Sequence, residues 1–292
     1  GLAVVADELE LSMLNSGLGM MSPSGRWVTY NTPMGGERQA SAHTIVFQAR
    51  AGTPELNCCS VNGPRALGML CEWAVMQRPD GLALNYYGPC TIKTSEATLT
   101  QTTDYPRDGR VEIAVEPIST APFALALRIP DWSEQTAIRL NGETLDEVVP
   151  GTYCEVNRSW QKGDTLVIDF DFRPRYWVKQ ESDAPLGAGI HLSSIYRGPL
   201  LLAYDAHHQE VDRADLPGFD SGALELRPVT DQRWLKPWLL FEVTATDGTI
   251  VRLCDFASAG MAGTAYQTWL PVRFDQPPGA ARLAHRTSEK HE

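Results

Sequence analysis

Hydrophobic residues recur with two different periods along the chain, and the first of them is helical. Near the amino end, Leu11, Leu14, Leu18 and Met21 are spaced as on one face of a helix. Acidic residues at positions 7, 8 and 10 fall in the opening turn of this predicted helix, where they complement the helix dipole. The pattern therefore predicts an amphipathic helix within the first twenty-five residues.

A second helix is predicted over residues 62–78. Asn62 is suited to the N-cap, Pro64 falls in the first turn, and apolar residues at positions 67, 70, 71 and 74 form one stripe. Pro79, Asp80 and Gly81 then predict its end. Two helices separated by irregular sequence are too little for a domain, so we expect them to belong to a larger helical unit.

From residue 82 the hydrophobic period changes to two, which is typical of half-buried strands. The alternation is clearest in three segments, residues 111–116, 123–129 and 166–172. Tight turns are predicted between such segments at Asp108-Gly109, Asn141-Gly142 and Lys162-Gly163-Asp164. Strands and turns at this spacing are typical of a β-sandwich.

A second β block follows, with strands predicted at residues 195–204 and at residues 239–253, the latter folded at Asp247-Gly248. Residues 205–225 are polar and aperiodic, which predicts a long loop. We expect the tail after residue 276 to be flexible. The predicted fold class is mainly β, with two sandwich domains.

Composition narrows the functional classes. The chain has 292 residues, 43% of them hydrophobic and 21% charged, as in a folded globular protein of about two domains. Its net charge of −11 argues against nucleic-acid binding. No apolar window reaches the roughly 18 residues of a spanning helix, so no membrane partner is expected.

The six cysteines are spread through a chain large enough to fold without disulfides, so we interpret them as mostly free thiols. Free thiols favour a reducing compartment. The first eight residues resemble neither a secretory signal nor a membrane anchor. These observations together predict a cytoplasmic location.

Cys58 and Cys59 form the most informative tract because they lie just before the second predicted helix. Unpaired N–H groups and the helix dipole at such a position favour a thiolate, which is the form that attacks carbon and binds metal. The alternative is two small buried residues at a helix entry. Two thiols alone do not complete a tetrahedral zinc site.

A second cluster of metal-ligand types follows the strand predicted at residues 195–204. It contains Asp205, His207, His208, Glu210 and Asp212. Because the cluster enters the predicted long loop, the sequence favours a solvated linker over a metal site.

Several short motifs, in this order along the chain, resemble the β-L-arabinofuranosidase-like glycoside hydrolases, family 127 and its relatives. They are Ala6-Asp7 through Glu10 and Asn15, the double cysteine followed by Asn62, Tyr105-Pro106-Arg107-Asp108-Gly109, Leu127-Arg128-Ile129-Pro130-Asp131-Trp132, Trp160-Gln161-Lys162-Gly163-Asp164, Arg197-Gly198-Pro199-Leu200 and Trp269-Leu270-Pro271. The resemblance covers residues 6–272.

The resemblance implies a domain order. In that family an (α/α)6 barrel carries the active site and two β-sandwiches follow. Residues 1–80 are then the last helices of the barrel, and residues 81–178 are the first sandwich. Residues 179–275 are the second sandwich, with its long loop near 205–225, and residues 276–292 are the flexible tail.

The resemblance also implies site residues. Cys58 matches the nucleophile of a retaining hydrolysis, and Cys58 with Cys59 matches two ligands of a bound zinc ion. Glu10 and Tyr30 match side chains that contact the hydroxyls of the sugar. Without the resemblance, Glu10 is a helix N-terminal charge and Tyr30 a partly buried aromatic. The general acid/base glutamate and the Glu-x-Cys ligands of the family lie upstream, and residues 1–57 contain no Glu-x-Cys.

Two hypotheses follow. In the first, the chain is the carboxy-terminal portion of a zinc-dependent retaining glycoside hydrolase acting on a furanosidic sugar of the arabinofuranoside type, and this chain alone is inactive. In the second, it is a non-catalytic accessory or carbohydrate-binding module. The sandwich surfaces are candidate contacts for a homodimer.

Overall fold

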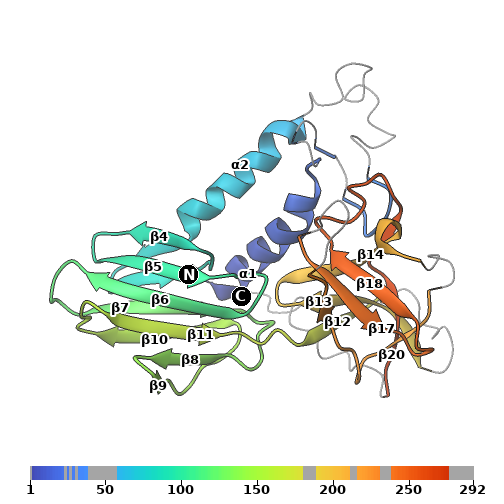
Figure 1. Cartoon of the computed structure of the whole chain (residues 1–292). Coiled ribbons are helices and arrows are strands. Elements are labelled where there is room, and N and C mark those ends of the chain that lie inside the picture. The colour runs from blue at the N-terminus through green and yellow to red at the C-terminus, as the bar shows by residue number, and fades with distance from the viewer. Residues whose placement is uncertain are drawn as a thin grey trace, which may run out of the picture. The chain divides into compact units, whose positions relative to one another are not determined.

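The computed structural model describes eight stretches of the chain. They are residues 2–22, 25, 28–29, 32–38, 58–179, 189–210, 216–230 and 238–275, with the backbone alone at Cys58, Ser60 and Val61. The predicted tail at residues 276–292 therefore lies outside the described residues. Strands make up most of the regular structure (Figure 1), which confirms the mainly β fold class.

The described residues form two compact units, each with its own elements. The first unit takes in residues 1–32, 39–173 and 197–200, and the second takes in residues 33–38, 174–196 and 201–292. Both helical segments thus group with the first set of strands. No helix in the described stretches is both long and apolar enough to cross a membrane.

The helical elements are α1 (Ala3–Ser12), the π-helical turn η1 (Met13–Gly17), α2 (Cys58–Trp73) and the 3-10 turn η3 (Ala206–His208). The strands of the first unit are β2 (Val75–Arg78), β3 (Gly81–Leu84), β4 (Cys90–Lys93), β5 (Ala97–Thr103), β6 (Arg110–Pro117), β7 (Phe123–Ile129), β8 (Ala137–Leu140), β9 (Glu143–Thr144), β10 (Thr152–Arg158) and β11 (Asp164–Asp169). Those mainly in the second unit are β1 (Gly35–Gly36), β12 (Pro174–Val178), β13 (Ile190–Arg197), β14 (Leu200–Asp205), β15 (Phe219–Asp220), β16 (Arg227–Pro228), β17 (Leu240–Thr244), β18 (Ile250–Asp255), β19 (Tyr266–Gln267) and β20 (Leu270–Arg273).

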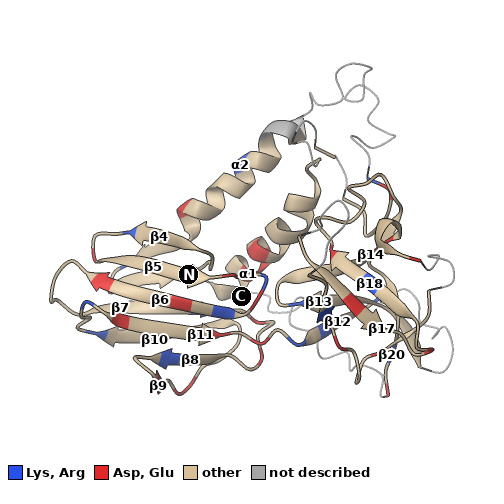
Figure 2. Cartoon of the chain, viewed as in Figure 1, with Lys and Arg blue, Asp and Glu red and all other residues tan. Residues whose placement is uncertain are grey.

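The first unit is a sandwich of two sheets, with the strand orders β10-β7-β3-β2 and β4-β5-β6-β11-β8-β9. One buried cluster takes residues from both sheets, including Leu125 of β7 and Ile113 of β6. The predicted turn at Asn141-Gly142 joins β8 and β9, and both of its residues have positive φ, 52° and 89°. Acidic and basic residues are interspersed along the strands of this unit (Figure 2).

Strand β7 differs from its predicted half-buried pattern because all seven of its residues are buried. Phe123, Leu125 and the other odd positions enter the sandwich core. The even positions are the small residues Ala124 and Ala126 together with Arg128, and they lie on the opposite face. Arg128 contacts α1, so this second face is covered by the helical segment.

The second unit is one continuous sheet with the central order β15-β20-β13-β14-β18-β17-β16. Strands from both halves of this sheet, among them β20 and β17, contribute to one buried cluster, so the sheet curls around that core. A second cluster covers the other face of β14 through Leu201 and Ala203. Strand β14 is therefore buried on both faces.

The structure corrects three local predictions. Helix α2 begins at Cys58, four residues before the predicted cap, and the Asn62 side chain accepts a hydrogen bond from Arg65 at 2.7 Å within the helix. The helix ends at Trp73, and Pro79-Asp80 form the turn between β2 and β3. The predicted long loop contains η3 and the short strand β15, whose Phe219 is fully buried.

Candidate functional site

The buried face of α1 is polar. Because α1 begins at Ala3, the acidic residues do not lie in its first turn. Asp7 and Glu10 are among the buried residues of this helix, whereas the predicted apolar stripe, such as Leu11, is only half-buried. The prediction that the acidic residues lie in the opening turn is therefore wrong, and two of them face a charged partner in the sandwich instead.

That partner is Arg128, at the even-numbered face of β7, with no exposed surface. Its Nη1 pairs with Oδ1 of Asp7, and its Nη2 lies 2.8 Å from Oε1 of Glu10. Its Nε donates to the Asn85 carbonyl at 2.6 Å. Tyr105 adds a hydroxyl that donates to Oε1 of Glu10 at 2.7 Å. One guanidinium thus fixes two carboxylates of α1.

Burial and charge set the protonation of these groups. Burial lowers the pKa of Arg128, but the surrounding acidic groups, with Glu10 the strongest, raise it above its ordinary value overall. Burial raises the pKa of Asp7 although the Arg128 charge opposes this. Burial and the nearby Glu10 charge raise the pKa of Tyr105 well above its usual range, which keeps the phenol a hydrogen-bond donor.

The second oxygen of Glu10 remains unused. Oε2 is buried and has no hydrogen-bond partner within the described part of the chain. A carboxylate that is held by one oxygen and unpartnered at the other presents a fixed acceptor. The structure thus places predicted site residue Glu10 in the Arg128 network, and Tyr30 lies outside the described residues.

The double cysteine opens α2 rather than preceding it. Cys58 is the first residue of the helix, and only its backbone is described, while Cys59 is half-buried and not in a disulfide. Gly63 is one turn after Cys59 on the same helix face. A Cβ at Gly63 would lie 2.7 Å from Sδ of Met20, so this face of α2 packs against the end of the first helical segment.

The first turn of α2 offers two thiols at the positive end of a helix, which is chemistry suited to zinc. Two further ligands would be needed for a closed site. Across the described residues, one group of three ligand types lies close enough to share a metal ion, and it does not include Cys59. The donor types of the pair fit zinc, and the described residues bring no two further ligands to it.

Motifs that are far apart in sequence meet in the first unit. The Asn15 side chain donates to the Pro199 carbonyl at 2.9 Å, and Arg197 donates to the Arg107 carbonyl at 2.5 Å. Gly198 has a φ of 55°, and a Cβ there would lie 2.6 Å from the Phe172 ring. These contacts bring motifs from distant parts of the sequence together within the first unit.

Sequence reasoning missed Arg128 as the centre of this assembly. A signal was present, because a lone arginine within an apolar strand needs a buried acidic partner. The pattern did not say which of the 36 acidic residues would supply it. The partners lie more than a hundred positions upstream, on a helix, and only the fold brings them to Arg128.

The solvated-linker interpretation of the second ligand cluster is wrong for two of its residues. Asp205 is 2% exposed and His208 is 7% exposed. Glu210 is exposed, and Asp212 lies outside the described residues. Asp205 ends β14 and caps η3, and this turn folds His208 back against the sheet.

One known family model matches the first sandwich. Residues 81–172 match the family model of the β-L-arabinofuranosidase GH127 middle domain. The resemblance expected from the motifs is thereby confirmed over these residues. A search of curated proteins gave no match.

Solved structures share the fold across nearly the whole chain. A glycoside hydrolase matches with a TM-score of 0.77 at 23% identity, covering 94% of this chain and 49% of its own. A GH127 β-L-arabinofuranosidase from Geobacillus stearothermophilus T6 matches with a TM-score of 0.74 at 19% identity, covering 93% and 46%. A GH127 β-arabinofuranosidase matches at 0.72 and 19%, with the same coverages. This chain therefore spans about half the length of these structures.

Proposed function

We propose that the chain is the carboxy-terminal portion of a retaining glycoside hydrolase that acts on a β-linked arabinofuranoside with Cys58 as the nucleophile. The observation that carries the proposal is the match of residues 81–172 to the GH127 middle domain, joined to two thiols at the start of α2. The names of the similar structures support arabinofuranosides as the substrate class.

Glu10 would contact the substrate in this proposal. Its Oε1 is held by Tyr105 and Arg128, which fixes the side chain without using Oε2. A sugar hydroxyl can donate to that remaining oxygen, and a held acceptor orients the ring at little entropic cost. Tyr30 would supply a second contact to the sugar.

The reaction has two steps. The Cys58 sulfur attacks the anomeric carbon as the glycosidic C–O bond breaks, and the leaving oxygen takes a proton from a carboxylic acid. The carboxylate that remains then takes a proton from water, whose oxygen attacks the same carbon as the C–S bond breaks, so the configuration is retained. Cys58 and Cys59 would hold a zinc ion, which when bound lowers the pKa of the thiols and takes charge off the sulfur.

A second candidate function rests on a different observation. Residues 1–57 contain no Glu-x-Cys, and the chain spans about half of the similar structures. A chain without those groups would serve as an accessory or carbohydrate-binding module. If the chain is such a module, we expect neither zinc bound at the double cysteine nor turnover of the substrate.

The test measures hydrolysis of 4-nitrophenyl β-L-arabinofuranoside by the longer protein that contains this chain. We expect Cys58→Ala to abolish turnover, because no other group replaces the nucleophile. Cys71→Ala is the matched control, since Cys71 is an exposed cysteine on the same helix, and it should leave turnover unchanged. Proton NMR of the first-formed sugar should show the β-anomer.

Full turnover by the Cys58→Ala variant would show that Cys58 is not the nucleophile. Turnover by the isolated chain would contradict the expectation that its acid/base group lies elsewhere. Absence of turnover in the longer protein, together with absence of zinc, would favour the accessory module.

A further inference from the structure

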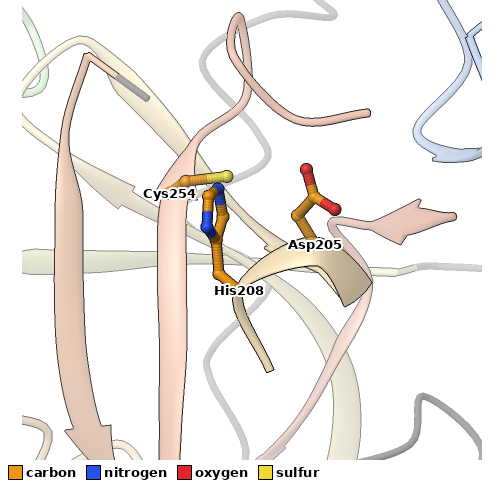
Figure 3. Close-up of side chains that lie close together, drawn as sticks. All are labelled: Asp205, His208 and Cys254. Carbon is orange, nitrogen blue, oxygen red and sulfur yellow. The ribbon is translucent and has the colours of Figure 1, made fainter. Parts of the chain in front are cut away.

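Three metal-ligand side chains from separate elements of the second unit are buried together (Figure 3). Asp205 ends β14, His208 lies on η3, and Cys254 lies on β18, where it is the register partner of Ala203 on β14. The candidate ligand atoms all lie within 4.8 Å of one another. Cys254 has no exposed surface, and the other two residues are almost fully buried.

The His208 imidazole is the unusual member. Only 7% of His208 is exposed to solvent. Its Nδ1 is buried and has no hydrogen-bond partner in the described structure. Native proteins rarely leave a buried polar atom without a partner. Burial lowers the pKa of His208, which favours the neutral imidazole that binds metals. Its ring points toward the Cys254 sulfur in Figure 3.

Asp205 is already oriented, as metal-binding carboxylates usually are. Oδ1 accepts hydrogen bonds from the His207 amide at 2.9 Å and the Thr264 hydroxyl at 2.6 Å. Oδ2 accepts one hydrogen bond from the residues that the structure describes, from the Gly260 amide at 2.8 Å. A carboxylate oxygen has two lone pairs, so Oδ2 retains one for a cation.

The surrounding charges favour a divalent cation. Two carboxylates, Asp205 and Asp255, are buried here, and the Arg38 guanidinium interacts with both of them and with Cys254. Arg252 also lies near His208, but it is paired with Glu242 at 3.0 Å. Burial raises the pKa of Asp255, and burial together with the Asp255 and Asp205 charges raises the pKa of the Cys254 thiol. A divalent ion that replaces the thiol proton supplies the positive charge that a thiolate needs at this position.

We propose that Asp205, His208 and Cys254 bind a zinc-class divalent transition-metal ion that ties β14, η3 and β18 together. One oxygen, one nitrogen and one sulfur ligand suit zinc or cobalt and do not suit magnesium or calcium, which prefer oxygen alone. Binding forms a metal–sulfur bond as the Cys254 thiol proton passes to the buffer, with no change in oxidation state. A solvent oxygen completes the tetrahedron.

This site is independent of the double cysteine, and the experiment separates the two. The Cys58→Ser/Cys59→Ser variant of the chain removes the other pair of thiols and is titrated with Co²⁺, followed by competition with Zn²⁺. We expect one Co²⁺ per chain, with the thiolate-to-cobalt charge-transfer absorption in the near ultraviolet. Zn²⁺ should abolish that absorption and raise the melting temperature, because it binds the folded state.

Adding Cys254→Ser to this variant should remove the absorption, and adding His208→Asn should weaken binding by more than about 100-fold, beyond the loss typical of an outer-shell partner. Cys154→Ser is the control, because Cys154 is buried in the core of the first unit. It should bind Co²⁺ normally. Far-ultraviolet circular dichroism verifies folding, and if Cys254→Ser does not fold, His208→Asn decides.

The proposal is overturned if the Cys58→Ser/Cys59→Ser chain shows no thiolate–cobalt absorption, or if the absorption survives Cys254→Ser. Either result leaves the role of Cys58 in hydrolysis untouched, because that role is measured by turnover in the longer protein.

Discussion

At the scale of single residues, Arg128 shows how a buried charge is tolerated. Arg128 is the largest fully buried residue of the described structure, and both Asp7 and Glu10 contact it. Moving a charged group from water into the protein interior costs free energy. This cost is offset only where an opposite charge is placed beside the group in good geometry. The Asn85 carbonyl provides a further acceptor, so the guanidinium is surrounded on several sides.

Arg128→Met is therefore expected to destabilise the chain by about 3–5 kcal/mol, because it leaves two carboxylates buried without their cation. Urea unfolding followed by tryptophan fluorescence measures the loss. Arg139→Met is the matched control, since Arg139 pairs with Asp169 at 2.7 Å but is 40% exposed. An exposed pair of this kind contributes about 0–1 kcal/mol. Equal losses in the two variants would contradict the buried network.

At the scale of elements, two turns of the first sandwich are joined by one carboxylate. Asp164 opens β11, and its Oδ1 accepts from the Asn141 side chain at 2.8 Å in the turn between β8 and β9. Its Oδ2 accepts from the Gln161 amide at 2.9 Å. Burial works to raise the pKa of Asp164, but these hydrogen bonds and the Arg158 charge lower it below its ordinary value.

A folded-state pKa below the unfolded value means that the Asp164 carboxylate stabilises the fold above the unfolded pKa of about 3.9. This contribution is lost as the pH falls through the lower, folded-state pKa. Asp164→Asn should therefore cost about 1 kcal/mol at neutral pH, the worth of a typical hydrogen bond, and progressively less below pH ~4. Unfolding curves across this pH range measure the difference.

Asp146→Asn is the control for Asp164→Asn, because Asp146 is exposed in the same sandwich. It should change stability little at either pH. A cost of Asp164→Asn that stays constant between neutral and acidic pH would show that the carboxylate charge has no part in fixing the turns.

At the scale of the whole molecule, the chain contains two compact units with separate cores. Leu99 belongs to the core of the first unit, and Leu253 belongs to a core of the second. Each of these leucines has no exposed surface. Separate cores open separately in hydrogen exchange, because each opening exposes its own apolar surface.

Leu253→Ala should cost its unit about 2–5 kcal/mol and accelerate amide exchange in β14, β17 and β18. Exchange in β5 and β6 should stay unchanged. Leu99→Ala is the reciprocal variant and should accelerate exchange in β5 and β6 alone. Hydrogen exchange measured by mass spectrometry resolves the two sets of peptides. Faster exchange throughout the chain in both variants would show that the units open together.

Much of the fold could be predicted because its signals are local. Alternation identified β6 and β7, and the Asn-Gly dipeptide identified the turn between β8 and β9. The start of α2 was predicted too late, because Asn62 is also a good cap in isolation. Helix α2 instead begins at Cys58, and its packing at Gly63 against Met20 is a tertiary contact.

For the candidate sites, the sequence identified the residue types, but it did not show which other residues would surround them in the fold. Cys58 and Cys59 could be identified by their adjacency and by the family motifs. Asp205 and His208 were recognised as ligand types but were interpreted as solvated, because nothing local predicts that a turn folds them against β18. Cys254 was not connected with them, since it lies more than forty positions further along the chain.

The sequence by itself determined the strand periods, the tight turns, the acidic charge and the family motifs, because these depend on near neighbours and composition. The tertiary structure alone decided that Arg128 pairs with Asp7 and Glu10, and that Asp205, His208 and Cys254 converge. The physical reason is that the energy of a buried polar group depends on partners brought from distant positions, and a one-dimensional pattern does not specify them.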